Sequence, residues 1–179
     1  VLVLVLVLVL VTVLYCNIWV HKSVYNCLCD APIVNVAPRG RATQSAEPAS
    51  AEMNPDMAND HYRNPRDSGK TCASVPMQDN PWWQLDLMSI YYITAVSVIS
   101  VEHCCHKQLN GAEIRIGLRN ETDNQRCAII STAEGQYKYD YECGKTLARF
   151  VHVVLPGEQR NLTVCEVQVF GSVCQLMVH

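Results

Sequence analysis

Two adjacent cysteines between two histidines form the most chemically distinctive stretch of the sequence, His103-Cys104-Cys105-His106. Zinc prefers thiolate and imidazole ligands, but ligands on consecutive residues cannot easily surround one ion. If the cysteines are oxidised to each other, they close a small strained ring that stiffens the loop. If they are split, each joins the loop to a different element. Either arrangement fixes the loop at 102–110, and binding residues gather on such fixed loops.

The sequence contains no recognisable catalytic constellation. It has neither the Gly-x-Ser-x-Gly turn of a nucleophile nor the His-Glu-x-x-His pair of a zinc hydrolase. Asp86 and Glu166 are candidates for paired carboxylates, but Asp86 is expected to end a strand by accepting bonds from backbone donors. The formal charge of −3, without a basic run, argues against a nucleic-acid partner. We therefore expect a binding protein rather than an enzyme.

The cysteine count indicates an oxidising compartment. Ten cysteines in 179 residues are typical of a disulfide framework and unusual for a reduced cytosolic protein. Two N-glycosylation sequons, which begin at Asn120 and Asn161, agree with this interpretation. The sequence therefore predicts a secreted, extracellular glycoprotein.

The N-terminal segment is almost pure Val-Leu alternation over residues 1–14. It predicts a signal peptide, with residues 1–29 as an apolar leader and residues 30–179 as one domain. Apolar character continues to Val20, so a membrane anchor and a buried strand remain alternatives. Cleavage after Cys29 would remove three cysteines, Cys16, Cys27 and Cys29.

Short runs of β-branched and aromatic residues make up most of the remaining chain. Gly, Pro, Asn or Asp separate them at spacings of about ten residues, and no segment keeps a helical period. The expected strands are 31–36, 41–45, 83–87, 91–100, 113–117, 126–130, 137–141, 149–155 and 162–170. This pattern predicts an all-β protein, an antiparallel β-sandwich or jelly roll.

The polar segment 46–68 is too long to be an idle connection in a compact domain. It is rich in oxygen-bearing side chains: Asn54, Asp56, Asn59, Asp60, Asn64 and Asp67. A solvated loop is one interpretation. A calcium site is the other, because calcium takes six to eight oxygen ligands, partly from the carbonyls of irregular backbone.

Several motifs together resemble the F-type lectin (fucolectin) family, the fucose-binding jelly rolls. They are Asn35-Val36-Ala37, Gly40-Arg41-Ala42-Thr43-Gln44-Ser45, Asn80-Pro81-Trp82-Trp83, Leu85-Asp86-Leu87, Cys104-Cys105, Leu109-Asn110-Gly111-Ala112-Glu113-Ile114-Arg115-Ile116-Gly117, Arg149-Phe150-Val151, Val153-Val154-Leu155-Pro156-Gly157 and Leu162-Thr163-Val164-Cys165-Glu166-Val167. In order, they cover about residues 34–171. The resemblance implies a jelly-roll fold and a carbohydrate ligand.

The resemblance also implies three disulfides and a structural calcium. The disulfides would be Cys72–Cys165, Cys104–Cys105 and Cys127–Cys143. Cys174 is not part of this set. It would form a disulfide with Cys27, with Cys29 or with another subunit of a homo-oligomer. Calcium would take side-chain oxygens from Asp60 and Glu166 and backbone carbonyls from Met57, Tyr62, Thr71 and Cys165, with the Thr71 hydroxyl as an additional ligand.

At the sugar site the sequence departs from the family, which holds fucose with a histidine and two basic residues beside the paired cysteines. In this chain Ser74 stands at the histidine position, and Val101 and Gln108 stand at the two basic positions. His103 stands at an aspartate position of the family pattern, beside Cys104 and Cys105. The basic residue Lys107 falls one position early. The charged fucose contacts are therefore missing.

Two functions follow from this departure. One is a lectin that binds glycans of altered specificity through a remodelled set of side chains: Ser74, His103, His106, Lys107 and Gln108. The other is a protein-interaction or structural module on the same fold, without sugar recognition.

Overall fold

The computed structural model describes residues 32–61, 72–101 and 106–173. Its strands are β1 (Val34–Asn35), β2 (Arg41–Gln44), β3 (Ala73–Gln78), β4 (Trp82–Ile99), β5 (Glu113–Gly117), β6 (Gln125–Ile129), β7 (Lys138–Val154), β8 (Arg160–Val164) and β9 (Glu166–Val173). Four short 3₁₀ helices, η1 (Ala37–Arg39), η2 (Ala51–Met53), η3 (Pro55–Ala58) and η4 (His106–Gln108), lie among these strands. Within these ranges no helix is long and apolar enough to cross a membrane.

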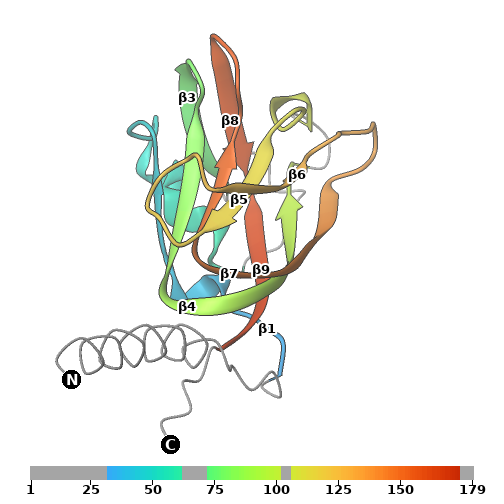
Figure 1. Ribbon diagram of the computed structural model, residues 1–179. Helices are drawn as coiled ribbons and strands as arrows, with labels where there is room; N and C mark the ends of the chain where they lie inside the picture. The colour runs from blue at the N-terminus through green and yellow to red at the C-terminus, as the bar shows by residue number, and fades with distance from the viewer. Residues whose placement is uncertain (1–31, 62–71, 102–105, 174–179) are drawn as a thin grey trace, which may run out of the picture. The chain divides into compact units, whose positions relative to one another are not determined.

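The strands form two antiparallel sheets (Figure 1). The larger sheet has seven strands in the order β1-β9-β4-β7-β5-β6, with β2 also paired to β4. The smaller sheet consists of β3 and β8, whose labels lie side by side in Figure 1. The predicted antiparallel β-sandwich is therefore confirmed.

Alternation of side chains places the core between the sheets. Inward-facing residues of the large sheet are nearly inaccessible, for example Trp83 and Leu85 of β4, Ile114 of β5 and Val151 of β7. The indole Nε1 of the fully buried Trp83 donates a hydrogen bond to the carbonyl oxygen of Pro55, at 2.8 Å. This bond ties η3 to the core.

Two pairs of expected strands are each one long strand, which corrects the prediction. The runs 83–87 and 91–100 are both parts of β4, and 137–141 and 149–155 belong to β7. The two long strands pair from Trp82↔Val154 to Ile99↔Lys138 through two irregularities. Exposed residues at the first irregularity, among them Met88 with a φ of 62°, break the apolar pattern without ending the ladder.

The last predicted strand, 162–170, is two strands. β8 pairs with β3, whereas β9 pairs with β4 and β1. The change of partner occurs at Cys165, whose backbone N–H donates to the carbonyl of Ile99 at 2.8 Å. The strand β3 was not expected, since Ser74 and Pro76 interrupt its apolar pattern.

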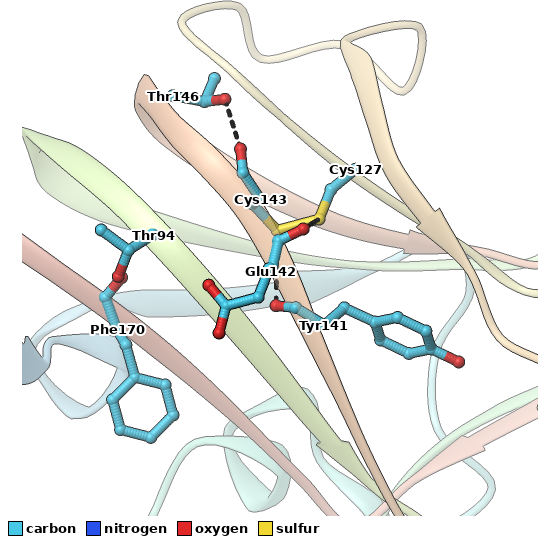
Figure 2. The surroundings of a disulfide bond; sticks show 7 residues. All are labelled: Thr94, Cys127, Tyr141, Glu142, Cys143, Thr146 and Phe170. Carbon is cyan, nitrogen blue, oxygen red and sulfur yellow. Dashed lines mark hydrogen bonds between the residues drawn. A yellow bond between two sulfur atoms is a disulfide. The ribbon is translucent and has the colours of Figure 1, made fainter.

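Two of the expected disulfides are present. Cys72–Cys165 joins the start of β3 to the junction of β8 and β9. Cys127–Cys143 joins β6 to the first part of β7, where Thr146 Oγ1 donates to the carbonyl of Cys143 at 2.8 Å (Figure 2). The Cys104–Cys105 pair, the leader and Cys174 lie outside the described residues.

Candidate functional site

The position expected to face a sugar, Ser74, lies on the outward face of the small sheet. Ser74 pairs in register with Thr163, and their hydroxyl oxygens are 3.4 Å apart. The neighbouring pair, Val75 and Leu162, is buried and faces the core. By the alternation of strand side chains, Asn161 lies on the same face as Thr163. Sequence reasoning missed Asn161 and Thr163 as surface neighbours of Ser74, because the β3–β8 register is invisible without the partner strand.

The loop that follows the paired cysteines reaches the same strand. η4 packs against β8, and Arg160 Nη2 of β8 donates to the carbonyl of Asn110 at 3.2 Å. Ser74 and Gln108 therefore belong to elements that both contact β8, although they are distant in sequence. His103, Cys104 and Cys105 lie outside the described residues, as does the side chain of His106.

Gln108, at the end of η4, carries a partly buried amide. Its side chain is half-buried, and its Oε1 is shielded from solvent and has no hydrogen-bond partner among the described residues. A buried acceptor without a partner is costly, so a donor from a ligand would be favourable there. Lys107, one position earlier, is exposed.

Val101 has a packing role. Only 4% of it is exposed, and it forms a small apolar cluster with Ile99 and the Cys72–Cys165 disulfide. A guanidinium in this environment would lose its hydration, which is costly unless the charge is paired. The position where the family carries a basic residue is therefore an apolar contact with a disulfide in this chain.

The residues expected to hold calcium are brought together in part. Glu166 is fully buried at the start of β9, directly after Cys165. η3, which contains Met57, packs against β3 and β9, and the exposed Asp60 follows η3 closely. Tyr62 and Thr71 lie outside the described residues, and among those described no group of three or more His, Cys, Asp and Glu side chains could hold a metal ion.

The donor chemistry nevertheless fits calcium. The expected ligand set contains two carboxylates and otherwise backbone carbonyls, and oxygen donors of this mixed kind are those calcium prefers. A carboxylate buried as completely as that of Glu166 also requires compensating charge or donors nearby.

An open cavity of about 380 Å³ lies beside β2. It lies between β2 with the turn that follows and the start of η3, and its polar side chains are Thr43, Gln44, Glu47, Asn54 and Asp56. Gln44 links the cavity wall to the candidate site, because its Nε2 donates to the carbonyl of Ser74 at 3.1 Å.

Two other polar side chains have structural roles. Asp86 pairs with Arg149, and the hydrogen bond from this guanidinium holds the pKa of the carboxyl below its usual value. Asp86 does not form a pair with Glu166, which lies on β9 opposite Ile99, the last residue of β4. His152, which sequence reasoning did not single out, is fully buried and bonded to Gln84 at 2.8 Å, and burial lowers its pKa to about 4.

Comparisons with known proteins agree with this architecture. Residues 57–153 match a family model described as a NedA-like, galactose-binding domain. The chain is 36% identical to a fucolectin from Anguilla anguilla over 142 residues, which cover 75% of this chain and 89% of that protein.

Among solved structures, the fold is similar to that of a fucolectin from Morone saxatilis serum, with a TM-score of 0.71 and 33% identity over 79% of this chain and 48% of that chain. A fucose-binding module of Streptococcus pneumoniae has a TM-score of 0.68 at 19% identity, over 77% of this chain and 95% of the module. At that identity the likeness concerns the fold alone.

Proposed function

The chain belongs to the fucolectin (F-type lectin) family, and we propose that it is a secreted lectin that binds glycans at the outward face of β3, β8 and η4. The observation that carries this proposal is that β3, with Ser74, and η4, with Gln108, both contact β8. Hydroxyl and amide groups on a rigid sheet suit a polyhydroxylated ligand, since they can both donate and accept hydrogen bonds. The matched relatives are lectins and carbohydrate-binding modules, which supports a binding role rather than a catalytic one.

We expect the specificity to differ from that of a fucose site held by cations. Ser74 and Gln108 are neutral, and Val101 is buried against the disulfide. Each lost charge-assisted hydrogen bond removes about 1.5–3 kcal/mol of binding free energy. A glycan of several rings would recover binding energy through additional contacts.

A glycan array tests this proposal. The expected result is binding to a class of oligosaccharides together with little binding to free fucose. Gln108→Ala should lower the signal at least tenfold, because it removes the amide that η4 contributes to the proposed site. Gln125→Ala is a matched control, since Gln125 is exposed on β6. Silence across fucosylated, galactosylated and other glycans would contradict the lectin assignment.

Calcium is a second part of the proposal. Asp60 and Glu166, with the carbonyls of Met57, Tyr62, Thr71 and Cys165, would hold the ion. The ion would neutralise the buried carboxylate of Glu166 and fix the segment before β3 against the start of β9. A chelator should then lower the melting temperature, and excess calcium should restore it. An unchanged melting temperature would count against calcium.

The alternative function is a protein-interaction module that has lost sugar recognition. The buried Val101, at a position where the family has a basic residue, favours it. A pull-down from the fluid into which the protein is secreted distinguishes the two functions. A partner that stays bound in the presence of fucose and oligosaccharides supports the module, whereas elution by a free glycan supports the lectin.

A further inference from the structure

The two sequons occupy structurally different places. Asn120 is exposed in the turn of residues 118–124, which connects β5 to β6. Asn161 is half-buried within β8. The sequence alone does not distinguish the two sites, whereas their exposure in the folded protein differs.

The β5–β6 turn is held from within, and the side chain of Asn120 takes no part in its bonds. The nearly buried Asn124 donates through Nδ2 to the carbonyls of Arg119 and Glu121, at 2.6 and 2.8 Å. Arg119 also forms ion pairs with Glu121 at 2.7 Å and Asp123 at 2.8 Å. A glycan on Asn120 would therefore extend into solvent without breaking any of these bonds.

Asn161 has a different environment. It lies two residues before Thr163, which pairs with Ser74, and alternation places all three side chains on the outward face of the small sheet. A glycan on Asn161 would project across the face at which we propose that ligands bind. It would also have to leave from a half-buried position in a paired strand.

We propose that Asn120 is the N-glycosylated residue and that Asn161 is unmodified and contributes to the ligand-binding face. The inference depends on the proposed secretory route. The glycan on Asn120 would lie near Leu118, which is 49% exposed, and near β6, which in the described part of the chain pairs with β5 alone. An N-glycan is bulky and solubilising, so it would discourage the edge of β6 from pairing with another chain.

In vitro translation with microsomes tests the assignment. The full chain receives a cleavable signal sequence, protease protection identifies the translocated product, and a glycosidase reveals the glycans as a gel shift. We expect one glycan on the unchanged chain and on Asn161→Gln, and none on Thr122→Ala, which keeps Asn120 but destroys its sequon. Asn120→Gln should behave like Thr122→Ala.

A translocated chain without a glycan, a chain with two glycans, or a glycan retained in Thr122→Ala would overturn the proposal. The glycan array can be run on protein without N-glycans, so its result does not depend on which asparagine is glycosylated. A failure of the lectin assignment can therefore be distinguished from a failure of the glycosylation assignment. Secreted Thr122→Ala should also self-associate more than the unchanged protein in size-exclusion chromatography. Equal elution volumes of the two proteins would show that the glycan does not prevent self-association.

Discussion

Arg149 binds both carboxylate oxygens of Asp86, from Nε to Oδ1 at 2.7 Å and from Nη2 to Oδ2 at 2.8 Å. The pair lies at the irregularity between Asp86↔Phe150 and Tyr91↔Ala148 in the β4–β7 ladder. Asp86 Oδ1 also accepts the N–H of Met88 at 2.8 Å, and the guanidinium lies 5.1 Å from the centroid of the Phe150 ring. One carboxylate therefore fixes the point at which the two long strands change register.

Replacing Asp86 by Asn should destabilise the protein in a manner that depends on pH. The pKa of Asp86 is lowered below 3.8, chiefly by the hydrogen bond from Arg149, so the ionised form is the stabilising one. Its contribution is present above the pKa of the unfolded carboxyl and is lost as the pH falls through the lowered pKa. Urea unfolding at several pH values should show Asp86→Asn to be weaker at neutral pH and the difference to shrink in acid. A difference that is constant with pH would exclude the ion pair as its source.

The buried His152 should make stability depend on pH in a higher window. Burial lowers its pKa from 6.5 to about 4, so the unfolded chain binds the proton more tightly than the folded protein does. Stability should therefore fall as the pH drops from about 6.5 to about 4, by up to about 3 kcal/mol from this residue.

Urea unfolding between these pH values checks the prediction. The variant His152→Gln should show a shallower slope than the unchanged protein. His61→Gln, at an exposed histidine, is the matched control. If His152→Gln keeps the full slope, the pH dependence arises elsewhere.

The two disulfides should differ in their contributions. Their cysteines are 93 and 16 residues apart, and closing the longer loop restricts the unfolded chain more. Loop entropy predicts losses of about 4–5 kcal/mol for Cys72→Ala with Cys165→Ala and about 3 kcal/mol for Cys127→Ala with Cys143→Ala. Denaturant unfolding of the two double variants measures the difference. The opposite order would show that strain or residual structure outweighs loop entropy.

Trp83→Phe should cost about 1–3 kcal/mol of stability, because it leaves a small cavity and removes the donor to the Pro55 carbonyl. The loss should loosen η3, which contains Met57. A loosened site would hold calcium less tightly, so we expect a smaller chelator-induced drop in melting temperature than in the unchanged protein. Trp82→Phe is the matched control, since Trp82 is only half-buried. Equal losses in the two variants would contradict a special role for Trp83.

The sequence predicted the fold class because the side-chain alternation is strong where a strand faces the core, as at Trp83 and Leu85. It failed where tertiary pairing overrides local pattern. The exposed Met88 marks the end of an apolar run, yet β7 remains paired with β4 on both sides of it. β3 went unnoticed because its short outward-facing stretch, with Ser74 and Pro76, has little alternation.

The candidate site could be predicted only through its family positions. The resemblance identified Ser74 and Gln108, but their relation depends on β8, which contacts the elements of both. No local signal shows that Thr163 faces Ser74, because this pair is 89 residues apart. The burial of Val101 could not be predicted either, since Val101 packs with two cysteines that are 93 residues apart in sequence.

The continuity of β4 and β7 has a consequence for how the domain has diverged. Because both strands run through the whole ladder, no group of strands in the large sheet should open alone, and amide hydrogen exchange should show one cooperative unit. Ser74 and Gln108 lie outside that ladder, on β3 and η4. These two residues can therefore be replaced at little cost in stability, and the fold can be kept while the ligand specificity changes.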